Sequence, residues 1–315
     1  MMDGTVPVFR DALFRKQGRH NTFKEIAVED VPRVGHVADS HCHLQLCAEP
    51  AVEAARAEVW GVTEFYDVVD LVEDGWDTVR RLEAWLDEGH ELARQFAGQV
   101  GVDPETLSRP VLHIIAGVHP HNAKYYDHAA EAELRRVLDD PRVVGIGEAG
   151  VDFHYNFSPQ DVQVEVFRRQ IRLAHETGFP LCLHIRDGHD LALRVLQEEG
   201  FPQAGCVLHC YNLDAETLAP WLAHDVYVGF DGPLTFAGND CVREAAATVP
   251  DARLLVETDA PYMTPAPMRG LPCGPGHVIF TTARLAEVLG LDQRELPRLA
   301  ARLGENAARL YRPRH

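Results

Sequence analysis

Residues 180–210 read PLCLHIRDGHDLALRVLQEEGFPQAGCVLHC and decide the fold. The apolar runs PLCLHI and GCVLHC flank residues 190–199, where apolar residues recur at helical spacing. This pattern predicts a strand, a helix and a second strand, and such a connection joins parallel strands by a right-handed crossover. A histidine stands near the end of each apolar run, His184 in the first and His209 in the second.

The same alternation extends over most of the chain. We expect eight strands, in the runs VADSH, VTEFYDVV, VLHIIAGVHPH, VVGIGE, PLCLHI, GCVLHC, VYVGF and RLLVETD. Helices are expected at about 48–59, 75–100, 161–178, 190–199, 214–223, 239–248, 278–290 and 293–311. Eight such units favour a closed (β/α)8 TIM-type barrel, of the α/β class, over an open sheet. We predict a single barrel domain over residues 37–315 and an N-terminal arm over residues 1–36, which is either packed on the domain or partly mobile.

The length, composition and charge of the chain limit which classes of protein it can belong to. The chain has 315 residues and is 46% hydrophobic, which is enough for a sizeable core. The 30 basic and 48 acidic residues give a formal net charge of −18. Such a surface repels polyanions and weighs against non-specific nucleic-acid binding, although a cationic patch or bound metal would reverse the sign locally.

The seven cysteines indicate a reducing compartment. Their number is odd and several lie in apolar runs, so we expect buried thiols in a cytoplasmic protein. Cys206 and Cys210 flank His209, but no second pair has zinc-finger spacing, which weighs against a structural zinc site. We expect no signal peptide and no membrane span, because no apolar run is long enough for either.

Imidazoles and carboxylates stand at the ends of the predicted strands. They are His41, His43, Glu148, His184, His209 and Asp259. In a barrel the carboxyl ends of the strands share one face, so these side chains should converge there. Together they would make a metal site, and metal-assisted hydrolysis is the leading hypothesis. Alternate strand residues point the same way, so His41 and His43 should face the barrel axis and Cys42 the helices.

Several of these residues also allow other interpretations. A pair such as His41 and His43 can arise by chance in a chain with 17 histidines. Glu148 could be a loop or capping carboxylate. Asp259 precedes Ala-Pro, which ends the strand, and it could bind metal, accept the proton of an attacking water, or do both. Glu257 could hold a ligand histidine in place.

Seven motifs in order resemble the TatD-related metal-dependent hydrolases, or TatD DNase family, within the amidohydrolase superfamily. They are ADSHCHL, GVHPH, GEAGVD, LHIRD, LHC, ETDAPYMTPAPMRG and GENAARLY, and they span residues 38 to about 311. The resemblance implies a (β/α)8-type barrel that binds two divalent ions (zinc, manganese or magnesium) and uses water as the nucleophile. Four histidines with two carboxylates suit zinc or manganese better than an all-oxygen magnesium site.

The resemblance also assigns roles by position. The implied ligands are His41, His43 and Asp259 for one ion, His184 and His209 for the second, and Glu148 as the bridge. The implied catalytic groups are Glu148 and Asp259, and Asp259 would also handle the proton of the water. Weaker candidates for substrate contacts are His119, His121, Arg186 and Arg269. His119 and His121 could instead be loop histidines with a structural role, and Arg186 could form a surface ion pair with Asp187.

The implied activity is that of a phosphodiesterase, a 3′–5′ exodeoxyribonuclease.

The sequence departs from the family pattern in four places. The arm before residue 37 and the region 67–110 are longer than is usual in the family. The run HCYNLD lacks the usual glycine, and the asparagine that usually follows the RG motif is replaced near Cys273. These changes leave an alternative open, a hydrolase of another ester or amide such as an aminoacyl-tRNA ester or a small metabolite. A non-catalytic binding protein is the third hypothesis, and six retained ligand residues argue against it. The native metal and the oligomeric state stay open.

Overall fold

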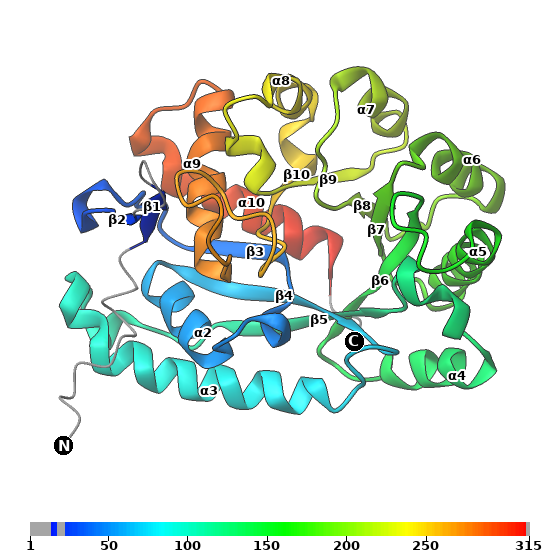
Figure 1. Ribbon diagram of the computed structural model, residues 1–315, viewed down its shortest axis with the longest axis horizontal. Coiled ribbons are helices and arrows are strands. Elements are labelled where there is room, and N and C mark those ends of the chain that lie inside the picture. The colour runs from blue at the N-terminus through cyan, green and yellow to red at the C-terminus, as the bar shows by residue number, and fades with distance from the viewer. Residues whose placement is uncertain (1–13, 18–22, 313–315) are drawn as a thin grey trace.

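The computed structural model describes residues 14–17 and 23–312. The prediction of an arm therefore falls in part outside the described residues. The described chain forms one eight-stranded sheet, a second sheet of two strands, and helices that lie around the outside of the larger sheet (Figure 1). This is a nearly closed (β/α)8 barrel, as the alternation in the sequence predicts.

The eight strands pair in sequence order, and each pairing is parallel. They are β3 (Val37–Cys42), β4 (Val62–Asp70), β5 (Val111–Gly117), β6 (Val143–Asp152), β7 (Leu181–Arg186), β8 (Cys206–Leu208), β9 (Tyr227–Phe230) and β10 (Leu254–Val256). The first and last strands meet through the residues that follow β10. The Asp259 amide donates to the His41 carbonyl at 3.0 Å, and the His43 amide donates to the Ala260 carbonyl at 2.8 Å.

Helices follow the strands and cover the outer face of the barrel. They are α2 (Pro50–Val59), α3 (Thr78–Phe96), α4 (His128–Val137), α5 (Gln160–Thr177), α6 (His189–Glu199), α7 (Ala215–Leu222), α8 (Asp240–Thr248), α9 (Val278–Val288) and α10 (Leu296–Leu310). The predicted end of α5 at Gly178 is confirmed, since that residue has a φ of 69°, the left-handed conformation that glycine adopts readily. Helix α4 was not predicted, because only Leu134 and Val137 are buried on it and its apolar stripe is short.

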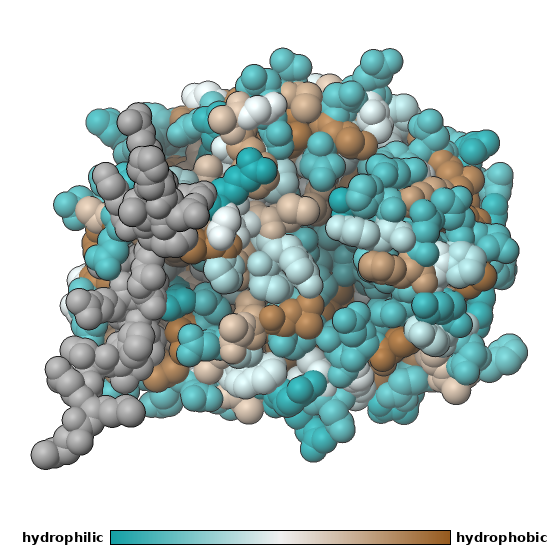
Figure 2. Space-filling model, viewed as in Figure 1, coloured by the Kyte–Doolittle hydropathy of each residue, from teal (hydrophilic) through white to brown (hydrophobic). Residues whose placement is uncertain are grey.

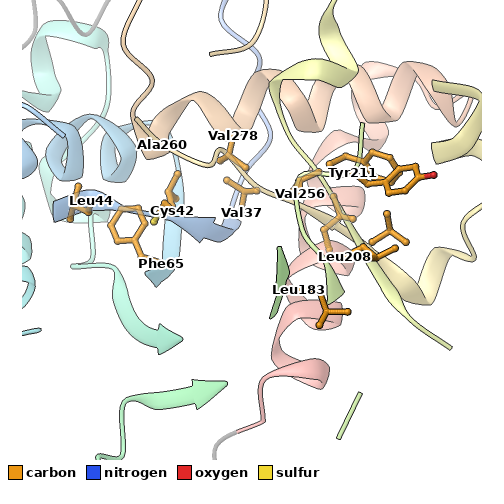
Figure 3. Packing of buried hydrophobic residues seen from close by; sticks show 14 of the residues in the cluster. Val37, Cys42, Leu44, Phe65, Leu183, Leu208, Tyr211, Val256, Ala260 and Val278 are labelled. Atoms are coloured by element: carbon orange, nitrogen blue, oxygen red, sulfur yellow. The ribbon is translucent and has the colours of Figure 1, made fainter. Parts of the chain in front are cut away.

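The core has two layers, because successive side chains along each strand point alternately outward to the helices and inward to the barrel interior. Residues pointing outward pack against the helices, as Figure 3 shows for Val37 of β3 beside Val278 of α9. Residues pointing inward, such as Tyr66 and Ile115, form a second cluster with the end of α10. Tyr311, from the late motif, lies with its ring centroid 5.0 Å from that of Tyr66 and fills the barrel interior. Each fully buried large side chain contributes roughly 1.5–3 kcal/mol.

The described part of the first 36 residues contacts the barrel. Strands β1 (Arg15–Gln17) and β2 (Phe23–Glu25) pair antiparallel. The buried ring of Phe14 lies with its centroid 4.8 Å from those of His277 and Phe280 and 5.8 Å from that of Trp60. This aromatic contact fixes the start of the described chain beside α2 and α9.

Among the described residues, none of the helices combines the length and the apolar character that crossing a bilayer requires. The face shown in Figure 2 is largely hydrophilic, and its hydrophobic residues lie in separate patches.

Candidate metal centre

The structure brings the six predicted residues together at the carboxyl ends of the strands. His41 lies in β3 and His43 just after it, Glu148 lies in β6 and His184 in β7, His209 follows β8, and Asp259 follows β10. These residues come from five strands far apart in sequence. Barrel closure is what makes them neighbours.

One group of donors consists of His41, His43 and Asp259. The two Nε2 atoms are 3.3 Å apart. Oδ1 of Asp259 lies 3.7 Å from Nε2 of His41 and 3.5 Å from Nε2 of His43. Two nitrogens bound to one zinc ion at the usual bond length in a tetrahedral site are about 3.3–3.4 Å apart. The donors and their spacing therefore fit a metal ion at their centre.

A second group consists of Glu148, His184 and His209. Oε1 of Glu148 lies 2.9 Å from Nε2 of His209 and 3.1 Å from Nδ1 of His184. The two histidine nitrogens are 3.1 Å apart. This spacing also fits a shared ion.

Glu148 lies between the two groups. Its Oε2 lies 3.6 Å from Nε2 of His43, and its Oε1 lies 3.8 Å from Nε2 of His41. Oε2 thus faces His43, while Oε1 lies closest to His184 and His209 of the second group, which is the placement that a bridging ligand needs. Glu148 is 6% exposed, so water does little to screen it.

Neighbouring groups fix the orientation of the first two histidines. Nδ1 of His43 lies 3.1 Å from the Val68 carbonyl, which accepts a hydrogen bond from Nδ1–H and leaves Nε2 free to bind a metal. Nδ1 of His41 lies 3.3 Å from Sγ of Cys182. The His41 ring also stacks on that of His209, with centroids 4.0 Å apart and planes inclined by 8°.

Two buried carboxylates hold the surrounding backbone. Asp39 accepts from the Thr258 amide at 2.9 Å and from the Thr258 hydroxyl at 2.6 Å, which anchors the segment before Asp259. Glu257 accepts from the Cys210 amide, and its Oε1 lies 3.6 Å from Nδ1 of His209. Glu257 therefore lies behind His209.

The charges of the centre are strongly coupled. Burial tends to raise the pKa of Glu148, but the surrounding histidines, His209 first, outweigh it and hold the pKa well below its usual value. Burial lowers the pKa of His43, yet Asp259 and Glu148 raise it to about 9. Burial and the neighbouring His209 lower the pKa of His41 far below its ordinary value. A metal ion would displace the proton from His43 on binding, since carboxylate and neutral imidazole are the ligand forms.

The two weaker histidine candidates lie beside the centre. Nε2 of His119 is 4.0 Å from Oε1 of Glu148. Nε2 of His121 is 2.8 Å from Oδ2 of Asp152, and the same oxygen is 3.4 Å from Nε2 of His184. Donor atoms of His119, His121 and His184 are close enough together to hold an ion as well.

The two arginine candidates lie against aromatic rings. The guanidinium carbon of Arg186 is 4.7 Å from the ring centroid of Tyr155, and Asp187 pairs with His154 instead of Arg186. The guanidinium carbon of Arg269 is 4.1 Å from the ring centroid of Phe236. Arg186 is the last residue of β7, two residues after His184, and its guanidinium lies over Tyr155 in the loop after β6.

Sequence reasoning did not find one further group of donors. Cys210, Asp231 and Asp259 also bring ligand atoms together. Sγ of Cys210 donates to Oδ2 of Asp231 at 3.1 Å, and burial raises the pKa of Asp231 well above its usual value. The only signal in the sequence was that Asp231 follows the apolar run VYVGF as the other carboxylates follow theirs.

Fold and site together define a barrel protein with a histidine–carboxylate metal centre, and comparison with known proteins places it in a family. A sequence model of the family described as TatD related DNase matches residues 38–312. The metal-dependent hydrolase YabD of Bacillus subtilis is 34% identical over 221 residues, which are 68% of this chain and 86% of that protein. The chain belongs to the TatD-related DNase family and is a metal-dependent hydrolase.

A second relative and a solved structure agree with this assignment. The 3′-5′ ssDNA/RNA exonuclease TatD of Erwinia billingiae is 37% identical over 205 residues, 62% of this chain and 76% of that protein. The crystal structure of the TatD homologue YJJV from Escherichia coli has a TM-score of 0.71 at 23% identity and covers 88% of this chain and 98% of its own. That structure supports the fold.

Proposed function

We propose that the protein is a two-metal phosphodiesterase that removes nucleotides from the 3′ end of single-stranded DNA or RNA. The observation that carries the proposal is the position of Glu148, whose two oxygens face two separate groups of histidines. Two ions on either side of one carboxylate suit an in-line displacement at phosphorus. The relative from Erwinia billingiae, named as a 3′-5′ ssDNA/RNA exonuclease, supports the choice of substrate.

The chain would divide the ligands as the sequence predicts. His41, His43 and Asp259 would hold one ion, His184 and His209 the other, and Glu148 would touch both. When bound, divalent ions polarise a phosphoryl oxygen and lower the pKa of water.

Asp259 would accept the proton of the attacking water. Asp259 is 9% exposed as a residue, and it stands at the end of the segment that Asp39 anchors through Thr258. A general base must be positioned within hydrogen-bond reach of its proton, and this anchoring restricts where Asp259 can lie. His119 and His121 would line the same mouth and contact the substrate.

The negative surface does not exclude a polyanionic substrate at this site. Arg186 has no carboxylate partner within 4.0 Å among the described residues, and its side chain is available to a phosphate. We propose Arg186 as a substrate contact, and Arg269 as a weaker one.

Turnover on a single-stranded oligodeoxynucleotide labelled at its 5′ end tests the proposal. Manganese, magnesium or zinc is supplied in turn, with the Glu148→Ala variant beside the wild type. Stepwise shortening that needs metal and disappears in the variant is the expected result. No shortening by protein that is shown to hold metal would contradict the nuclease proposal.

One observation favours the alternative of a less charged substrate. Acidic residues at and just after the end of β4 lie near residues of the centre. Gln45, two residues from His43, donates to Asp74 at 3.0 Å, and Asp70 accepts from the His119 amide at 2.8 Å. An acidic rim would favour a cationic or neutral ester, such as an aminoacyl ester. If oligonucleotides are not shortened, release of an amino acid from an aminoacyl ester is the measurement that tests this candidate.

A further inference from the structure

Two aromatic side chains are exposed in the loop between β6 and α5. Tyr155 is 50% exposed and Phe157 is 57% exposed. Their rings are stacked, with centroids 5.4 Å apart and planes inclined by 7°. Rings of this size usually lie in the core because of the area that they bury, so an exposed stacked pair points to a ligand that covers it.

The pair lies next to the metal centre. The ring of Phe157 meets that of His121 edge-on, with centroids 4.8 Å apart. His121 in turn shares the carboxylate of Asp152 with His184, one of the proposed ligands. Phe157 is therefore linked to the centre through His121, whose ring centroid lies 6.1 Å from that of His184.

Cationic side chains accompany the rings. The guanidinium of Arg186 lies over Tyr155, and Nζ of Lys124 donates to the carbonyl of Phe157 at 2.9 Å. Among the described residues neither cation has a carboxylate within 4.0 Å. The chain as a whole has a net charge of −18, so two cations without a carboxylate partner form a local positive site. Beside exposed aromatic rings, such a site suits a ligand that carries both an aromatic group and a negative charge.

Hydrogen bonds hold this loop in place. Oδ1 of Asp152 accepts from the amides of His154 and Tyr155 at 3.0 and 2.9 Å. The buried hydroxyl of Ser158 donates to the His121 carbonyl at 2.7 Å and accepts from the Lys124 amide at 3.0 Å. The rings are thus presented on a preorganised loop, which reduces the entropy lost when a ligand covers them.

We propose that Phe157, supported by Tyr155, is a stacking platform for an unpaired nucleobase, with Arg186 and Lys124 beside the phosphates of the same strand. Tyr155 already contacts Arg186 and Phe157, so the more exposed Phe157 is the ring that a base reaches. Stacking on an aromatic face together with cations along the backbone is how proteins bind single strands without reading sequence. The proposal rests on the proposed nuclease function and specifies a strand with splayed bases as its substrate.

Binding measured apart from turnover tests the platform. The metal-loaded protein is titrated against a 5′-fluorescein oligodeoxynucleotide whose last three linkages are phosphorothioates, which slow cleavage. A matched strand carries abasic tetrahydrofuran residues at the same three positions. Wild type should bind the intact strand about 5- to 100-fold more tightly than the abasic strand, since that is the range expected for one or more stacked bases.

Matched variants assign the effect to the ring. Phe157→Ala should abolish the difference between the two strands, and Phe157→Tyr should restore it. Tyr262, which is 54% exposed, provides a control of similar exposure, and Tyr262→Ala should keep the difference. Equal binding of both strands by wild type, or an undiminished difference in Phe157→Ala, would overturn the platform.

The two proposals can fail separately. If wild type prefers the intact strand but does not shorten an unmodified one with any metal, the nuclease proposal fails and the platform stands. If wild type shortens the strand but binds intact and abasic strands alike, the platform fails and the nuclease proposal stands.

Discussion

Nε2 of His209, which follows β8, lies 2.9 Å from Oε1 of Glu148, which lies in β6. The other oxygen of Glu148 lies 3.6 Å from Nε2 of His43. The carboxylate therefore lies between the two sets of histidines. Removing its charge should therefore disturb both sets at once.

Glu148→Gln should reduce activity by at least about 100-fold, because loss of groups that merely orient metal ligands already costs 10–100-fold. The measurement is the initial rate of oligonucleotide shortening at saturating metal, with circular dichroism as the check on folding. Glu64→Gln is the matched control, since Glu64 is also a strand carboxylate paired with a histidine, His113, at 3.0 Å. Equal activity in wild type and Glu148→Gln would refute the bridging role.

Much of this site could be predicted from the sequence because each donor stands at or near the end of a run that predicts a strand. The runs before His184, His209 and Asp259 identify strands, and parallel closure then determines which ends meet. The order of the motifs along the chain also predicted the protein family. What remained was the detail that depends on three-dimensional packing.

Asp152→Asn should lower activity about 10- to 100-fold by disturbing His121 and His184, which share Oδ2 of Asp152. The amide supplies a donor where a carboxylate accepted, so the imidazole tautomer of His184 changes. The expected signature is a weaker apparent affinity for metal, measured by titrating activity with manganese. Asp187→Asn, which alters an exposed carboxylate paired with His154, should leave this titration unchanged. An unchanged titration in Asp152→Asn would rule out the positioning role.

Thr258→Val should destabilise the fold by about 1–3 kcal/mol, because it removes a buried donor to the carboxylate of Asp39. Urea unfolding measures the change in free energy. Thr106→Val provides the comparison, because the Thr106 hydroxyl bonds a carbonyl at the exposed surface, and its effect should stay within about 0.5 kcal/mol. Equal stability of the two variants would show that the Asp39–Thr258 contact contributes nothing.

Stability should fall as the pH decreases from about 6.5 to about 4, in part because of His277. Burial lowers the pKa of this residue from its ordinary value of 6.5 to about 4, and its Nδ1 accepts from the Gly274 amide at 2.9 Å. Between these two values the unfolded chain binds a proton that the folded chain does not, so the free energy of unfolding decreases by up to about 1.4 kcal/mol per pH unit.

His277→Asn isolates this contribution, because the asparagine oxygen can accept from Gly274 but does not titrate. Urea unfolding at pH 4.5, 5.5 and 7 should give a shallower dependence for the variant than for wild type. Identical slopes would mean that His277 binds protons equally in both states.

Other features could not be predicted from the sequence for physical reasons. The role of Asp39 depends on the approach of the segment after β10 to β3, a contact between residues more than two hundred positions apart. The position of Arg186 over Tyr155 depends on the path of a loop, where no periodic pattern constrains the backbone. Helix α4 has too short an apolar stripe to stand out from its surroundings.

The amount of metal bound per chain tests the central claim most directly. Wild type and Glu148→Ala are loaded with manganese or zinc, desalted, and analysed by inductively coupled plasma mass spectrometry. The account predicts about two ions per wild-type chain, as in two-metal hydrolytic sites, and a clear loss in the variant. No retained metal in active wild type, or two ions in Glu148→Ala, would contradict it.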